Sequence, residues 1–113
     1  MGALSIKLLP EAVRSLAFGS ISGTYAGVGN PLSNPSRILL IQNYTDALLM
    51  FSFDGISDHI PVAPNGFVLL DITANKTVSQ GFYIAEGTRM YVKEIDTPTS
   101  GSVYVSSFYG IDS

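Results

Sequence analysis

The stretch RILLIQNYTDALLMFSFDGISDHIPV, residues 37–62, contains two apolar runs separated by a short polar break, and it decides the fold class. The first run, residues 37–43, is apolar at successive positions, which is typical of a strand covered on both faces. The second run, residues 47–54, also places apolar side chains on both faces, because alternate residues of a strand point to opposite sides. The break at residues 44–46 predicts a turn. We therefore expect these two strands to pair as a hairpin, with the second strand central in its sheet.

The same pattern of short apolar runs continues on either side of this stretch. Val, Ile, Tyr, Phe and Thr cluster between Gly, Pro, Asn and Asp, and we count about eight strand-length runs. In residues 59–62, Pro61 has no N–H to donate, which predicts an edge strand. The spacing predicts an all-β fold, an antiparallel β-sandwich of jelly-roll type, with a small barrel as the alternative. We expect one domain over residues 1–113, with residues 1–30 partly an extended N-terminal arm.

Composition indicates which partners to expect. The 113 residues are 46% hydrophobic and 13% charged, against about 25% charged in soluble domains, which predicts a homo-oligomer or a docked subunit. The six Lys and Arg residues are scattered through a chain of net charge −3, so we expect no nucleic-acid partner. No apolar run approaches the roughly 20 residues of a spanning helix. We therefore expect a soluble protein with no membrane partner and no secretory leader.

The search for chemistry centres on His59, the single histidine of the chain, which lies close to Asp54 and Asp58. These ligands are too few and too unevenly spaced for a zinc or calcium site, and cysteine is absent. A turn explains them better: Asp54 and Gly55 form a corner with positive φ, and Asp58 accepts backbone N–H groups in a second turn. His59 is then a half-exposed side chain bonded across the sheet. Since neither a nucleophile motif nor a carboxylate pair is indicated, we expect no cofactor, no metal and no enzymatic activity.

Aromatic and apolar side chains near the two ends of the chain are the candidate contact residues. The last run, residues 102–110, places aromatic residues on both faces of a strand, so that one face serves the core and the other a partner. The interface residues that we expect are Phe18, Ile21, Tyr25, Tyr104, Phe108 and Tyr109. Aromatic residues on a β surface also stack against sugars, which leaves a carbohydrate- or receptor-binding module as an alternative.

Six motifs, taken in their order and spacing, resemble those of a group of small virion structural proteins of tailed bacteriophages. The motifs are NPSR (34–37), QNYTD (42–46), SFDGISDH (52–59), PNGFVLLD (64–71), GTRMYVK (87–93) and PTSGSVYV (98–105). The resemblance covers roughly residues 12–110. It implies a non-enzymatic β-sandwich subunit that decorates or cements the capsid, or alternatively a neck or tail subunit such as an adaptor or collar protein. It also implies a place in the virion, assembled in the host cytoplasm, and contacts with major capsid or portal and neck proteins.

Overall fold

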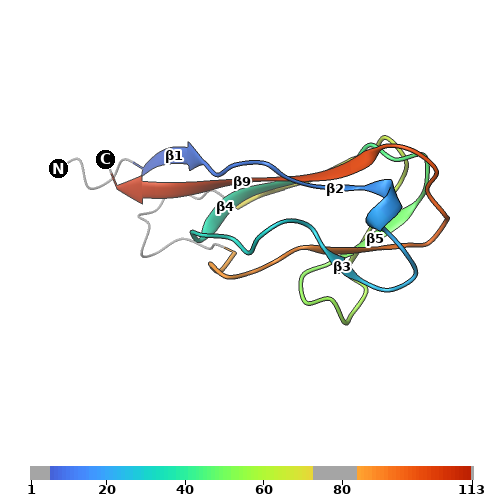
Figure 1. Ribbon diagram of the computed structural model, residues 1–113. Helices are drawn as coiled ribbons and strands as arrows, with labels where there is room; N and C mark the ends of the chain where they lie inside the picture. The colour runs from blue at the N-terminus through green and yellow to red at the C-terminus, as the bar shows by residue number, and fades with distance from the viewer. Residues whose placement is uncertain (1–5, 73–83, 113) are drawn as a thin grey trace.

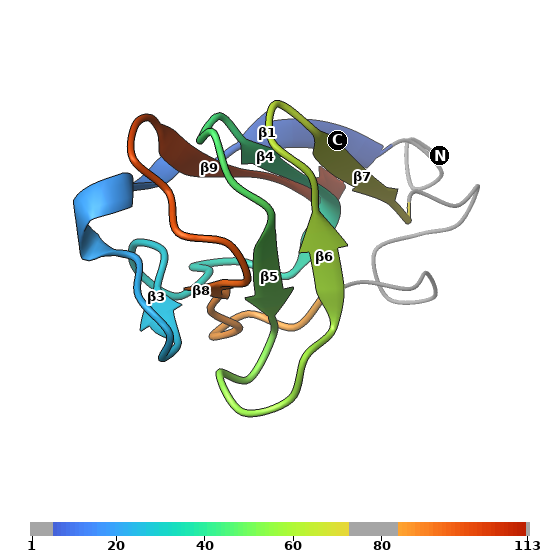
Figure 2. The ribbon, with the colours of Figure 1, turned by 90° about the vertical axis from the view of Figure 1, so that its right-hand side faces the viewer.

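The computed structural model describes residues 6–72 and 84–112, which fold into two antiparallel sheets packed as two layers (Figure 1 and Figure 2). The five-stranded sheet contains β1 (Ile6–Pro10), β2 (Arg14–Ala17), β4 (Ser36–Asn43), β7 (Phe67–Asp71) and β9 (Ser102–Asp112). The four-stranded sheet contains β3 (Ala26–Gly27), β5 (Leu49–Ser52), β6 (Ile60–Val62) and β8 (Tyr91–Glu94). A single turn of 3₁₀ helix, Phe18–Ser20, follows β2. Within the described ranges no helix has the length and apolar character needed to cross a membrane.

The strand order is that of a jelly roll. Both β1 and β2 pair with β9, β1 along residues 108–112 and β2 along residues 102–105, so they share one edge of the sheet. The two orders then read β2-β9-β4-β7 and β3-β8-β5-β6. Each sheet interleaves strands from the two halves of the chain, as the double Greek key of a jelly roll requires. The predicted all-β antiparallel sandwich of jelly-roll type is confirmed.

The core lies between the sheets and is supplied mainly by the four central strands, β4, β9, β5 and β8. The apolar side chains with 0% exposure are Val28, Leu39, Ile41, Leu49, Phe51, Val92, Val103 and Val105. Along each strand these residues occupy every second position, because successive side chains point to opposite faces. Each fully buried side chain of this kind stabilises the fold by about 1.5–3 kcal/mol.

Residues 37–43 and 47–54 do not form the predicted hairpin. β4 pairs with β7 and β9, whereas β5 pairs with β6 and β8 in the other sheet. Both sides of β4 are therefore occupied, and residues 44–48 carry the chain from one layer to the other. The other two predictions for this stretch are confirmed: β5 is central in its sheet, and β6, which contains Pro61, is an edge strand.

The described part of the N-terminal region contributes strands to both sheets, and the partial extended arm within residues 1–30 stays a prediction. β1 and β2 pair with β9, and β3 pairs with β8, so backbone groups of this region join both sheets. In Figure 1, β1 runs alongside the C-terminal end of β9. Residues 1–5 lie outside the described residues. The sandwich therefore includes the N-terminal strands as part of its structure.

Candidate functional site

The candidate site is the outer face of the five-stranded sheet, on the side away from the core. Leu39 and Ile41 of β4 point into the core, so the residues between and beside them point outward. The register places Leu40 between Leu69 of β7 and Ser106 of β9. By the same alternation, the outer face of β4, β7 and β9 is defined by nine residues: Ile38, Leu40, Gln42, Phe67, Leu69, Asp71, Tyr104, Ser106 and Phe108.

Large apolar side chains on the outer face are accessible to solvent. Phe67 is 67% exposed and Leu69 is 52% exposed, while the apolar residues of β4 and β9 on this face are half-buried. Among the nine outer-face residues, Asp71 is the one with a charged side chain. A sheet with one face in water usually carries polar side chains on that face, whereas a sheet covered on both sides is apolar on both. The outer face therefore has the character of a contact surface.

Two of the predicted interface residues lie on the outer face, and one lies in the core. Tyr104 and Phe108 are half-buried on the outer side of β9. Phe18 is 38% exposed in the 3₁₀ turn after β2. Ile21 is 7% exposed and packs in the core, so the prediction that it contacts a partner is wrong. The chain turns inward after the 3₁₀ turn, and the small residues around Ile21 gave no sign of this change of direction.

Tyr25 belongs to a polar cluster that joins three segments. Its hydroxyl donates to the Asp58 carboxylate at an O···O distance of 2.5 Å, and Lys93 Nζ lies 3.0 Å from the same carboxylate. Lys93 Nζ also sits 4.8 Å from the centre of the Tyr25 ring. Burial, and then the hydrogen bond to Asp58, raise the pKa of Tyr25 to about 12, while the Tyr25 and Lys93 hydrogen bonds lower the pKa of Asp58. Asp58 thus accepts from side chains in this cluster, which corrects the prediction that it accepts backbone N–H groups.

The turn after β5 is built as the sequence predicts at Asp54 and Gly55. Gly55 has a φ of 73°, and Asp54 Oδ1 accepts the backbone N–H groups of Ile56 and Ser57 at 2.8 and 2.9 Å. These N–H groups hold the pKa of Asp54 down to about 2. The exposed His59 accepts the backbone N–H of Phe53 at Nδ1, at 3.0 Å, rather than bonding across the sheet. This places the proton of a neutral His59 on Nε2 and makes the imidazole part of the turn.

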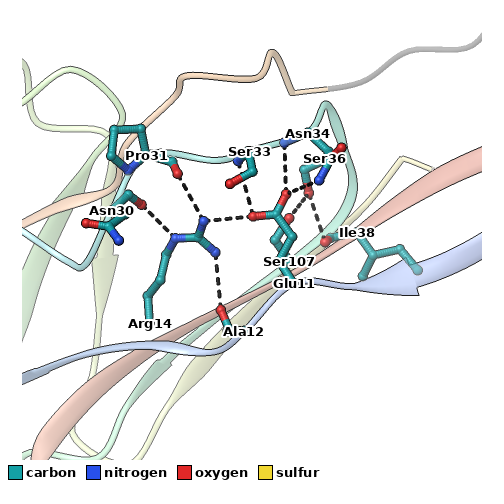
Figure 3. A network of polar contacts seen from close by, with 10 residues as sticks. All are labelled: Glu11, Ala12, Arg14, Asn30, Pro31, Ser33, Asn34, Ser36, Ile38 and Ser107. Carbon is teal, nitrogen blue, oxygen red and sulfur yellow. Dashed lines mark hydrogen bonds and ion pairs between the residues drawn. The ribbon is translucent and has the colours of Figure 1, made fainter.

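A second polar network, which the sequence analysis missed, fixes the connection between β1 and β2 (Figure 3). The Arg14 side chain donates to the carbonyl oxygens of Asn30 and Pro31, at 2.6 and 3.0 Å, and to Glu11 Oε1 at 2.7 Å. Glu11 Oε2 accepts the backbone N–H and the side-chain amide of Asn34, at 2.9 and 3.1 Å. Burial raises the pKa of Glu11, but the hydrogen bonds from Arg14 and Asn34 outweigh it and lower this pKa. The network anchors the loop that precedes β4 to the β1–β2 connection.

An open pocket of about 530 Å³ lies beside this network. It is lined by Pro10, Glu11, Ala12, Val13, Arg14, Ser15, Gly29, Asn30, Ser33, Asn34 and Tyr109. The charged groups of Glu11 and Arg14 are already hydrogen-bonded within the network, which leaves the half-buried Tyr109 ring and neutral polar groups to meet a ligand. A pocket of this composition suits a small neutral polar molecule.

Arg37, at the start of β4, is a buried cation. It is 2% exposed, and its Nε, Nη1 and Nη2 atoms make no hydrogen bond to any of the described residues. Removing a guanidinium from water without an anionic or hydrogen-bonding partner is costly. Sequence reasoning did not predict this burial, because an Arg at the end of an apolar run usually faces solvent.

Within residues 6–72 and 84–112, no group of three or more His, Asp and Glu side chains lies close enough together to hold a metal ion. No protein-family model matches the chain, and no curated protein matches it.

Proposed function

We propose that the chain is a non-enzymatic structural subunit of a tailed-phage virion, a capsid decoration or cement protein that stabilises the shell through subunit contacts. The observation that carries this proposal is the outer face, on which Phe67 and Leu69 are more than half exposed and one residue in nine is charged. Apolar surface of this kind is stabilised when a partner removes it from water, by about 25 cal/mol for each Å² buried.

Two further points support the proposal. Jelly rolls are common among viral capsid proteins, although the fold is used for many functions and this support is by analogy. The order of the six motifs resembles that of small virion structural proteins, and the low content of charged residues fits a chain that is covered in its working state. A neck or tail subunit fits the same observations and differs in the number of copies.

The number of copies of this chain in each virion distinguishes a shell protein from a neck or tail protein. Quantitative mass spectrometry of purified virions measures the ratio of this chain to the major capsid protein. A decoration or cement protein is expected in hundreds of copies, because shell sites repeat over the whole capsid, whereas neck and tail rings hold about a dozen or fewer. A count of about a dozen would replace the shell proposal with the neck or tail alternative.

A charge on the outer face tests the proposed surface. Leu40→Glu places a carboxylate at the centre of the outer face, while Ile56→Glu adds the same charge to the loop between β5 and β6, where Ile56 is 84% exposed. With both variants shown to fold by circular dichroism, Leu40→Glu is expected to lose incorporation into virions and Ile56→Glu to keep it. Normal incorporation of Leu40→Glu would contradict docking through this face.

The pocket beside Tyr109 favours a second candidate function, binding of a carbohydrate. Sugars stack on aromatic rings and hydrogen-bond to neutral amides and hydroxyls, and the pocket lining provides both. A glycan array with the purified chain tests this function, with Tyr109→Ala as the pocket variant and Tyr44→Ala, at an exposed tyrosine that does not line the pocket, as its control. Binding that is lost in Tyr109→Ala alone would support it, and the absence of binding to any glycan would count against it.

A further inference from the structure

The edge of β7 differs from the other edges of the two sheets. Edge strands offer backbone donors and acceptors to other chains, and proteins usually block them with Pro, Lys or very short strands. β6 contains Pro61, β1 contains Lys7 and Pro10, and β3 has two residues. β7 has five residues, Phe67–Asp71, without Pro, Lys or Arg. β2, which shares an edge with β1, has four residues and contains Arg14. Among the described strands, β7 is therefore the edge strand of more than two residues that has no Pro, Lys or Arg.

Two hydrogen bonds show which backbone groups of β7 face β4. Asn43 N donates to the Gly66 carbonyl oxygen and Ile72 N donates to the Arg37 carbonyl oxygen, both at 2.9 Å. Hydrogen-bonded pairs alternate with non-bonded pairs along an antiparallel ladder. The even-numbered residues from 66 to 72 therefore bond to β4, and the odd-numbered residues between them direct N–H and C=O to the opposite side.

Phe67 and Leu69 thus present backbone donors and acceptors at the edge, where no other described strand pairs with β7. Their side chains are also exposed, on the outer face. An edge of this kind combines unpaired backbone groups with apolar side chains, which is the combination that promotes strand addition.

We propose that two copies of the chain pair antiparallel through β7, across a two-fold axis that passes beside Leu69. In this register Leu69 faces Leu69 of the second copy, and Phe67 faces Asp71 of the second copy. The two Asp71 residues are then offset by four positions, about 14 Å along the strands. This separation exceeds the Debye length of about 8 Å at physiological ionic strength, so their repulsion is screened. A parallel in-register pairing would instead place the two carboxylates side by side.

Sedimentation equilibrium over a range of concentrations tests this dimer, which does not depend on the proposed virion function. The contact is small, so we expect a dissociation constant of about 1–100 µM for the unmodified chain. Leu69→Pro removes an N–H that faces the edge and leaves the hydrogen bonds between β7 and β4 in place. This variant is expected to weaken dimerisation at least about tenfold. Leu69→Ala keeps that N–H and is expected to weaken dimerisation less than Leu69→Pro.

Leu70→Pro is the matched control for the backbone argument. The N–H of Leu70 faces β4, so this variant is expected to lower the midpoint of thermal unfolding, whereas Leu69→Pro is expected to change it much less. A larger loss in the unfolding midpoint for Leu69→Pro than for Leu70→Pro would show that the edge has been assigned to the wrong residues, and it would overturn the proposal.

Amide hydrogen exchange of the unmodified chain gives a test that needs no variant. The Phe67 and Leu69 amides are expected to exchange fast in dilute solution and slowly at concentrations where the dimer forms, while the Val68 and Leu70 amides are protected in both. A chain that stays monomeric at every concentration would overturn the proposal. So would a dimer in which the Phe67 and Leu69 amides exchange as fast as in the monomer, because such a dimer must use another surface.

Discussion

Asn43→Ala is predicted to destabilise the sandwich strongly, because the Asn43 side chain links the two sheets from a fully buried position. Asn43 is 0% exposed at the end of β4. Its Nδ2 donates to the carbonyl oxygens of Ala47 and Val62, at 2.8 and 2.9 Å, and its Oδ1 accepts the N–H and the hydroxyl of Thr45, at 2.9 and 2.6 Å. Val62 belongs to β6, so one side chain joins the end of β4, the crossing loop and an edge strand of the other sheet.

The size of the effect follows from the partners that alanine leaves behind. The Thr45 hydroxyl also lies 3.2 Å from the Ala47 carbonyl oxygen, so these two groups can satisfy each other. Two buried groups lose their Asn43 partner without such a replacement. They are the N–H of Thr45 and the carbonyl oxygen of Val62. Two unsatisfied groups at about 1–3 kcal/mol each give a loss of about 2–6 kcal/mol. This is a large part of the about 5–15 kcal/mol by which domains are usually stable.

Urea unfolding followed by tyrosine fluorescence measures this loss, since the chain has six Tyr and no Trp. The matched control is Gln42→Ala, one residue earlier on β4, whose side chain points to the outer face and donates to the Tyr44 hydroxyl at 3.0 Å. Because this position is half-exposed, Gln42→Ala is expected to lower the free energy of unfolding by less than about 0.5 kcal/mol. An Asn43→Ala variant within about 1 kcal/mol of the unmodified chain would refute the assignment of the loss to unsatisfied groups.

Four further predictions concern the β5–β6 turn and the start of β4. Gly55→Val is expected to impair folding, measured by the yield of folded protein, because φ is 73° and an added Cβ lies 3.2 Å from the Tyr91 ring. Asp54 has a folded pKa of about 2, below its ordinary value of about 4, so its contribution to stability is present above pH 4 and lost as pH falls toward 2. The midpoint of thermal unfolding should therefore fall more steeply between pH 4 and pH 2 for the unmodified chain than for Asp54→Asn. Arg37→Met is expected to raise the free energy of unfolding, measured in urea, by about 1–4 kcal/mol, because it removes a buried charge. A lower free energy of unfolding in this variant would indicate that Arg37 has an anionic partner. His59→Ala is expected to leave the fold and the incorporation into virions almost unchanged, as checked by circular dichroism and by mass spectrometry of virions.

The sequence was informative about individual strands and much less about their partners. Alternation of side chains identified β5 as central, Pro61 identified an edge strand, and Gly55 identified a turn. The predicted hairpin was wrong because consecutive strands of a jelly roll often cross between layers, as β4 and β5 do here. A turn motif is local and reports only that the chain changes direction, whereas strand pairing is decided by the packing of segments far apart in the sequence.

The same limit explains what could be predicted of the candidate site. Apolar residues on both faces of residues 37–43 and 102–110 already indicated that this sheet has apolar side chains on its outer face as well as on the side of the core. The burial of Ile21 and Asn43 was harder to predict, since each lies among small or polar residues that are typical of exposed loops. Both are buried because neighbouring segments fold over them, and Asn43 is accommodated by four hydrogen bonds that no spacing of residues could reveal.

The outer face and the edge of β7 belong to one sheet, so the two proposals constrain each other. An antiparallel pair of β7 strands has its two-fold axis perpendicular to the sheet, and the outer faces of both copies then lie on the same side. A shell that binds one outer face can bind both at once, and the second contact benefits from a raised effective concentration even where each contact is weak. At the opposite edge, which β1 and β2 share, Lys7 and Pro10 of β1 and Arg14 of β2 disfavour a further addition. Pairing is therefore expected to close at two copies, as an isologous contact does, rather than to extend into a fibre.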